Sequence, residues 1–505
     1  MELELRQETV RGWETVCRTS LEQEETGEMI VPDACPDIWQ VLDGEARLLL
    51  QRKEPQDGRG ELAGLLKTTI LYQPEGEEGV RAMEVTLPFS ASPELKGLTR
   101  RSVLHVVPRV LSVDIHLLNP RKVLVRVGYC LEIEGFSPQT RSLAAGVEGA
   151  QDKGIQQKTG LLRSFQTVYV QEKNFTYQDA VVLPAGRPDA AELLRTRAQC
   201  TCTEARVIGS KLVFKGEAFL QLLCRGEDGS LFTGDFHLPY SQIMDAGEDS
   251  EEGLCHMDLL FTDVKCTTAG EDRRTFQVEL ALQAQAVLRR EVTVSVLTDL
   301  YSTTHDLQPE GDTCPVQRLL GQGEGQETAR ETVETGGIPG NLLDVQVRLG
   351  RAGQSQEGED CILTQEVELV ILYDTPEGVA AGHRRASVQH RLAGQTGCTF
   401  TAELLREPTA APVGEGVEVS FPLAFHWMAL ERQETPVIGR VMLGEKREET
   451  ERLPSVTLRA VRPGEDLWSV AKAYLTTDQE ILDASGLTTE EIFPGQMLLI
   501  PHKSH

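Results

Sequence analysis

The sequence has no run of apolar residues close to the roughly 20 that a helix needs to cross a bilayer. Its first residues, MELELRQETVRGWETV, have acidic side chains where a secretory signal has basic ones. No uninterrupted apolar segment follows them. We therefore expect a soluble protein that is not exported by the signal-peptide route.

Cysteine does not follow the pattern of a disulfide framework or of a zinc site. The eleven cysteines are an odd number and are scattered along the chain. Cys200 and Cys202 are one residue apart, and Cys255, His256 and Cys266 follow much later, without a CxxC pair to complete a site. We expect small core residues in a reducing cytosol, and no metal.

Basic side chains are outnumbered, with 50 against 78 acidic ones, and the formal net charge is −28. The mean field therefore repels phosphate backbones and anionic membranes, and nucleic acid is not an expected partner. The acidity is typical of a soluble surface, with an acidic docking face as the alternative.

Sequence motifs for catalysis are missing as well. There is no Gly-x-Ser-x-Gly elbow and no phosphate loop that ends in Gly-Lys-Ser/Thr. The run GQGEGQ at 321–326 lacks the preceding strand and following helix of a dinucleotide loop, so we interpret it as a linker. The basic HRRASVQH at 383–390 is interpreted as part of a strand face. We expect no enzyme and no cofactor.

Three segments of the chain repeat one layout. The strand and turn TTILYQPEG (68–76), AFLQLLCRGEDG (218–229) and VELVILYDTPEG (367–378) place Tyr72, Cys224 and Tyr373 at steps of 152 and 149 residues. The opening motifs VPDACPD (31–37) and LPAGRPD (183–189) also lie 152 residues apart. In the third copy, 338–341 stands at this place without a second Pro-Asp, so we expect a truncated relative.

Each repeat ends in a strand in which apolar residues alternate with mostly polar ones, as in a sheet with one wet face. The apolar positions are Val123, Val125, Val127, Tyr129, Leu131 and Ile133, then Phe276, Val278, Leu280, Leu282, Ala284 and Ala286, then Val417, Val419, Phe421, Leu423, Phe425 and Trp427. The prediction is a mainly β protein with antiparallel domains. Short helices are expected at 37–50 and 189–199, because a proline precedes each segment.

Polar joints at 142–160, 321–337 and 444–455 lack periodicity, and we interpret them as linkers. They predict four units: 1–141, 161–318, 338–444 and 456–505.

The last fifty residues predict a small α+β unit of the order βααβ. A strand at 456–461 stops at Pro463-Gly464, and the apolar residues from Leu467 to Tyr474 then follow helical spacing. Thr477 and Glu480 form a capping box for a second helix, which ends at Gly486. A second strand follows at 497–500.

With VRPGEDLWSVAKAY, QEILDASGL and IFPGQMLLIP in this order, the unit resembles a LysM module along almost its whole length. The resemblance implies a groove that binds N-acetylglucosamine glycans. Its walls would be Gly464, Glu465, Asp466 and Leu467 on one side and Ile492, Phe493, Pro494 and Gly495 on the other. Asp466 replaces a small hydroxyl residue of the family and Ser485 replaces Asn, while Leu467, Ile492 and Phe493 could instead be core.

The repeats resemble SPOCS (spore coat assembly) domains, through IVPDACPDIWQVL and VVLPAGRPDAAELL. SPOCS domains followed by LysM are the arrangement of the SipL family of clostridial coat morphogenetic proteins. That resemblance implies a non-enzymatic scaffold that binds the coat ATPase, stage IV sporulation protein A, at the forespore surface in the mother cell. The alternatives are a LysM protein that binds peptidoglycan in the envelope or cortex, and an enzyme with an unrecognised site.

Overall fold

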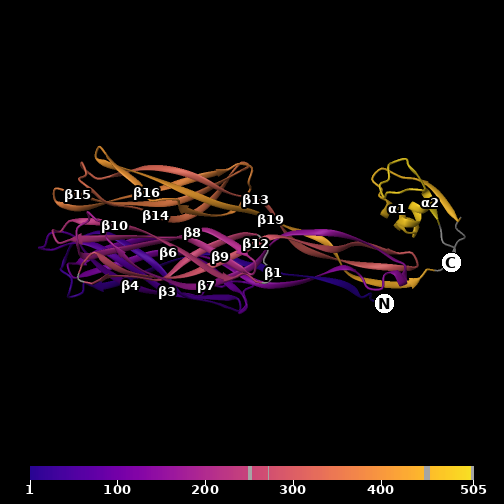
Figure 1. The fold of residues 1–505 in the computed structure, drawn as a ribbon, viewed down its shortest axis with the longest axis horizontal. Helices are drawn as coiled ribbons and strands as arrows, with labels where there is room; N and C mark the ends of the chain where they lie inside the picture. The colour runs from indigo at the N-terminus through magenta and orange to yellow at the C-terminus, as the bar shows by residue number, and fades with distance from the viewer. Residues whose placement is uncertain (248–252, 271, 448–454, 502–505) are drawn as a thin grey trace.

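The computed structural model describes residues 1–247, 253–270, 272–447 and 455–501. Before residue 455 these residues form strands β1 to β19 and one short 3-10 helix, η1 (Gln151–Lys153). The two α-helices of the described residues lie in the C-terminal module. None of the described helices is long and apolar enough to cross a membrane. A head of packed sheets narrows into a stalk, and the module sits at the far end of the stalk (Figure 1).

Each repeat has the same strand order, which confirms the mainly β prediction and the duplication. A long strand comes first, then a three-stranded meander, then a hairpin whose second strand returns along the first strand. The first repeat comprises β1 (Leu5–Ile30), β2 (Ile38–Gln56), β3 (Arg59–Pro74), β4 (Arg81–Ala91), β5 (Val103–Asn119) and β6 (Lys122–Val147). The second comprises β7 (Ile155–Val182), β8 (Ala190–Ile208), β9 (Lys211–Gly226), β10 (Leu231–Asp245), β11 (Leu254–Ala269) and β12 (Thr275–Ser302).

The third repeat keeps this order with one strand divided. It comprises β13 (His305–Glu334), β14 (Leu342–Glu357), β15 (Asp360–Thr375), β16 (Gly378–Leu392), β17 (Thr399–Leu404), β18 (Thr409–Val413) and β19 (Gly416–Lys446). The short strands β17 and β18 both pair with β19, where the other repeats have one continuous strand.

Within each repeat the meander packs on the sheet of long strands to form a sandwich. In the first repeat, for example, β2-β3-β4 faces β1-β6-β5. The alternating residues that the sequence assigns to the inner face are buried in all three copies; Trp427 alone is only partly buried. Ladder pairing joins the long-strand sheets of the first two repeats at one residue pair, Trp13 and Thr167.

The two helices expected in the repeats are wrong, because 38–56 and 190–208 are strands β2 and β8. Both strands pair along their length with the next strand of the meander. Register shifts interrupt β2 at Ile38/Gln40 and Val41/Asp43, and they interrupt β8 at Ala190/Glu192 and Leu193/Arg195. Each bulge displaces the side-chain alternation by one residue, and this hides the strand pattern in the sequence.

The expected linkers are also largely strands where the structure describes them; the exceptions are the turn around η1, residues 335–337 and residue 455. Residues 142–147 end β6, 155–160 begin β7, and 321–334 lie in β13; residues 448–454 are outside the described part. The segment 321–326 is a strand, and it is rich in glycine because bulky side chains cross it. A Cβ atom on Gly323 would lie 3.2 Å from the Trp427 ring, and one on Gly325 would overlap His390.

A conserved geometric detail marks each meander. A side chain at Gly64 would overlap the carbonyl oxygen of Leu49, and one at Gly216 would overlap that of Thr201, opposite the equivalent bulges. Gln365 occupies the same place in the third repeat, where its amide donates to the carbonyl groups of Gly350 (3.0 Å) and Arg351 (3.3 Å). The same bulge is therefore accommodated in two ways.

The stalk consists of three two-stranded ribbons formed by the ends of the long strands that leave the head. The ribbons are β1 with β6, β7 with β12, and β13 with β19. All three contribute to an apolar core that includes Val147, Ile155, Leu297, Leu300 and Val441. Backbone hydrogen bonds join them as well, as from Leu3 to the Val441 carbonyl at 2.9 Å.

The head is built around a pseudo-threefold axis, where the meanders of the three repeats meet. One apolar cluster on this axis takes equivalent leucines from each repeat, namely Leu42, Leu194 and Leu343, and Leu71, Leu223 and Leu372. These sets keep the 152- and 149-residue steps of the sequence. The three repeats of the one chain are therefore arranged like the three subunits of a trimer.

Candidate functional site

The C-terminal module has the predicted βααβ order, as β20 (Val456–Ala460), α1 (Leu467–Tyr474), α2 (Asp478–Ser485) and β21 (Met497–Pro501). The capping box of Thr477 and Glu480 is confirmed, and Gly486 caps α2 in the left-handed region at φ 64°. A second capping box joins Asp466 and Ser469 at the start of α1. The helices cover the inner face of the sheet, where Leu498 and Ile500 are fully buried.

The two loops that were predicted to form a groove do lie together. The amide of Val461 donates to the carbonyl of Gln496 at 2.9 Å, and the amide of Gly495 donates to the carbonyl of Val461 at 2.8 Å. Gly464 and Gly495 both have positive φ and face open space, so a larger residue at either position would strain the backbone without meeting a neighbour.

The remaining predicted residues differ in their exposure. Leu467 is 3% exposed and belongs to the core, and Ile492 packs against that core. Phe493 is 66% exposed, and Pro494 beside it is also exposed. Phe493 is therefore the large apolar side chain that these loops offer to a ligand.

Glu465 stabilises its own turn. Its carboxylate pairs with Arg459 at 2.6 Å and accepts a hydrogen bond from the amide of Arg462 at 2.9 Å. The Arg462 amide, together with the Arg459 charge, lowers the pKa of Glu465.

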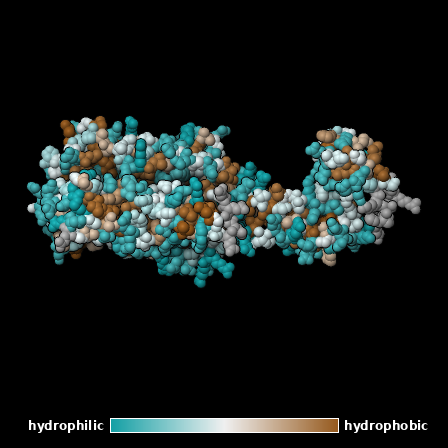
Figure 2. Space-filling view, viewed as in Figure 1, coloured by the Kyte–Doolittle hydropathy of each residue, from teal (hydrophilic) through white to brown (hydrophobic). Residues whose placement is uncertain are grey.

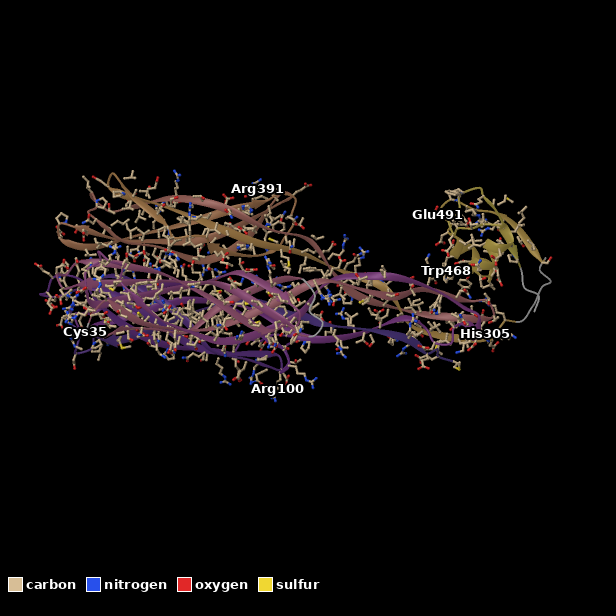
Figure 3. All side chains as sticks on the ribbon, viewed as in Figure 1. Cys35, Arg100, His305, Arg391, Trp468 and Glu491 are labelled. Atoms are coloured by element: carbon tan, nitrogen blue, oxygen red, sulfur yellow. The ribbon has the colours of Figure 1, made fainter. Side chains whose placement is uncertain are left out.

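A clamp between α1 and the stalk tip holds the module in place. Tyr301 of β12 is 4% exposed and packs edge-on against Trp468, with the ring centroids 4.9 Å apart. Its hydroxyl donates to the Thr476 carbonyl at 2.7 Å. Asp299 accepts from the Trp468 indole at 2.9 Å and from Lys472 at 2.6 Å. Figure 3 shows Trp468 on the side of the module that faces the stalk.

The clamp also reaches one wall of the predicted groove. Lys158 of β7 contacts the Asp466 carboxylate at 2.8 Å, while the other carboxylate oxygen accepts from the Ser469 amide at 3.0 Å. Hydrogen bonds from Lys158 and Ser469 lower the pKa of Asp466 to about 2. The carboxylate at the place where the family has a small hydroxyl residue thus joins the module to the stalk.

Ser485, the other departure from the family pattern, also has a structural role. Its hydroxyl accepts from the Leu499 amide at 2.9 Å and contacts the Leu499 carbonyl at 3.3 Å, so it ties the end of α2 to β21. It lies outside the two groove loops.

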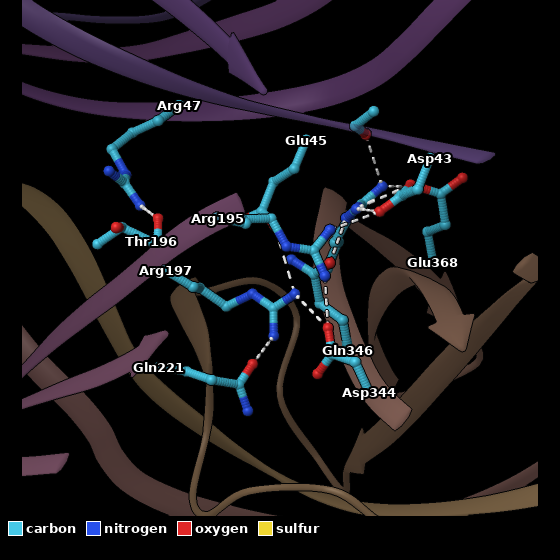
Figure 4. Close-up of polar contacts among 12 residues, drawn as sticks. Asp43, Glu45, Arg47, Arg195, Thr196, Arg197, Gln221, Asp344, Gln346 and Glu368 are labelled. Atoms are coloured by element: carbon cyan, nitrogen blue, oxygen red, sulfur yellow. Dashed lines mark hydrogen bonds and ion pairs between the residues drawn. The ribbon is translucent and has the colours of Figure 1, made fainter. Parts of the chain in front are cut away.

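A buried charge network, which no sequence motif indicates, lies on the axis of the head (Figure 4). Arg195 of the second repeat contacts Asp43 of the first repeat at 2.7 Å and Asp344 of the third repeat. These side chains are at most 3% exposed. Arg348 also contacts Asp43, at 2.9 Å, and Arg197 contacts Asp344 at 3.2 Å.

The charges of this network stabilise one another. Burial raises the pKa of Asp43, but the Arg348 and Arg195 charges outweigh it and hold the pKa below its usual value. The same balance, with Arg197 and Arg195, lowers the pKa of Asp344. A signal was present in the sequence, because Asp43, Arg195 and Asp344 keep the steps of 152 and 149 residues.

No group of metal-ligating side chains that could hold an ion occurs within the described ranges. The eleven cysteines all have free thiols. Several histidines contact carboxylates on other strands, for example His105 with Asp258 at 2.9 Å and His390 with Glu327 at 2.9 Å.

Comparison with protein families matches two parts of the chain. Residues 37–118 match the SipL, SPOCS domain family, and residues 460–501 match the LysM domain family. A search of curated proteins and a search of solved structures each found no match. The first match covers the meander of the first repeat and most of β5, and the second covers the module clamped to the stalk. The chain is thus a SipL-like protein, in which a SPOCS domain is combined with a C-terminal LysM domain.

Proposed function

We propose that this chain is a non-enzymatic scaffold of endospore coat assembly, which docks through its LysM domain to the coat ATPase, stage IV sporulation protein A. Docking takes place at the forespore surface in the mother-cell cytoplasm. The observation that carries this proposal is the combination of a SPOCS domain with a LysM domain in one chain.

The structure supports a protein partner in two ways. The charged residue at the predicted groove mouth, Asp466, already contacts Lys158 and the start of α1, which leaves its carboxylate fewer acceptor positions for sugar hydroxyls. Phe493 offers an exposed apolar group of the kind that forms the centre of protein interfaces. The alternative is a protein of the envelope or cortex that binds N-acetylglucosamine glycans, and the open space beside Gly464 and Gly495 favours it.

The test is binding of the purified full chain to the ATPase and, separately, to chitin oligomers. Phe493→Ala should weaken ATPase binding by about 2 kcal/mol or more if this side chain is a hot spot. Glu491→Ala is the matched control, because this exposed carboxylate lies in the same loop as Phe493. Its removal should change binding by well under 1 kcal/mol. Circular dichroism must first show that both variants are folded.

Tight oligosaccharide binding without affinity for the ATPase would replace the scaffold by the glycan-binding alternative. A fluorescent fusion gives an independent result in cells. A signal around the forespore inside the mother cell supports the scaffold, whereas labelling of vegetative walls contradicts it.

A further inference from the structure

The LysM module carries an apolar face that neither its own core nor the stalk uses. In the sheet register Val456 lies opposite Pro501, Leu458 opposite Leu499, and Ala460 opposite Met497. These residues alternate with the buried ones and therefore point away from the helices. The large side chains on this outer face are all exposed: Val456 by 46%, Leu458 by 60%, Met497 by 52% and Leu499 by 39%.

The clamp explains why the stalk, within the described residues, leaves this face open. The sheet is covered on its inner side by the helices, and the stalk contacts α1 through Trp468, Lys472 and the capping residue Asp466. The outer face thus lies on the other side of the sheet from the helices. Figure 2 shows apolar residues at the surface of the module beyond the stalk.

The outer face continues into the groove loop. Met497 follows Phe493 by four residues, and the turn between them is closed by a hydrogen bond from the Gln496 amide to the Phe493 carbonyl at 3.0 Å. Backbone pairing at the edge of β21 is restricted, because Ser485 already binds the amide of Leu499. The side chains of the face, rather than the strand edge, are what a partner can contact.

The charge of the module argues against a second copy of this chain as the occupant. Residues 455–501 hold three basic and seven acidic side chains, and the whole chain has a net charge of −28. A second copy would therefore bring one acidic module against another.

Sugar is also a poor occupant of the outer face. None of its six residues has a polar side chain, and recognition of glycan hydroxyl groups needs placed hydrogen-bonding groups. An apolar face on an acidic module is complementary to an apolar surface that is accompanied by lysine and arginine.

We propose that the outer face of β20–β21 is a docking surface for a protein that presents an apolar patch with a basic rim. This inference rests on the proposed function, and it names the face of the LysM module that meets the partner. Leu458 lies at its centre, directly opposite Leu499, and Phe493 extends the surface toward the groove.

The test uses the full chain with Leu458→Glu, which places a charge at the centre of the face. We expect the Kd for the coat ATPase to rise at least about 30-fold, as for the loss of a hot spot. Met497→Gln, which adds no charge, should raise it less. The matched control is Ile338→Glu, the same kind of change at an 82% exposed apolar residue of the head, and it should leave the Kd unchanged.

Each other outcome contradicts the inference in a distinguishable way. If the wild type binds the ATPase and Leu458→Glu binds equally well, the outer face is excluded while the proposed function stands. If the wild type does not bind the ATPase, the proposed function and the outer face fail together. Loss of chitin-oligomer binding in Leu458→Glu would assign the face to sugar. Loss of a concentration-dependent dimer in sedimentation would assign it to a second copy.

Discussion

The buried network on the axis of the head makes a quantitative prediction for Arg195→Met. Methionine fills most of the volume of arginine but removes the contacts with Asp43 and Asp344, which are buried almost completely. Removing one partner of a buried ion pair typically costs 3–5 kcal/mol, because the remaining charge is left without compensation. Asp43 keeps Arg348, and Asp344 keeps Arg197, so we expect the lower end, about 3 kcal/mol.

The assay is calorimetric unfolding of the full chain, with Arg391→Met as the control. Arg391 also contacts two carboxylates, but its side chain is 59% exposed, and exposed pairs contribute about 1 kcal/mol or less. Arg195→Asp should cost more than Arg195→Met, since it would gather three aspartates on the axis. Equal stability of Arg195→Met and Arg391→Met would refute the axial assembly of the three repeats.

Three further predictions concern the axis, the clamp and the meander bulge. Because the folded pKa values of Asp43 and Asp344 are lowered, their stabilisation is present above about pH 4 and is lost as the pH falls through the folded values; melting temperatures measured from pH 6 down to 3 should fall less steeply in Asp43→Asn. Tyr301→Ala should release the LysM module from the stalk, seen as faster hydrogen exchange in α1, whereas replacement of the exposed Lys158 should change it little; unchanged protection in Tyr301→Ala would contradict the clamp. Gly64→Ala should destabilise the first repeat by about 3 kcal/mol, because the new methyl group overlaps the Leu49 carbonyl. The control is Gly353→Ala, at a glycine of β14 that faces open space, and it should leave the stability unchanged. Equal melting curves for the two variants would show that the bulge can move.

The sequence predicted those elements whose signal is local. Regular alternation in the last strand of each repeat identified the buried face, and the capping residues Thr477 and Gly486 placed the ends of α2. Where bulges shift the alternation, as in β2 and β8, a proline at the start was wrongly taken as a helix signal. Strand pairing between distant segments overrides such local preferences.

The relation between the repeats could not be read from one repeat at a time. The segment 142–147 lacks a clear alternation and therefore resembles a linker, but residues 143–147 are buried because they pack against the neighbouring ribbons of the stalk. The burial of Asp43 and Arg195 could not be predicted, because each is buried only by a partner about 150 residues away. At the groove, chain order placed the two loops correctly, but the contact of Asp466 with Lys158 joins residues 308 positions apart.

The long ladders also determine how the molecule would respond to force. β1 and β6 run side by side for almost all of their 26 residues, a length of roughly 85 Å. Ladder hydrogen bonds lie across the strands, so tension between the LysM module and the far turns of the head loads them in shear, and many must break together. The weak link under tension is then the clamp at Tyr301, where one aromatic contact and a few polar contacts carry the load. Under tension the molecule would therefore release its LysM module from the stalk before its sheets unfold.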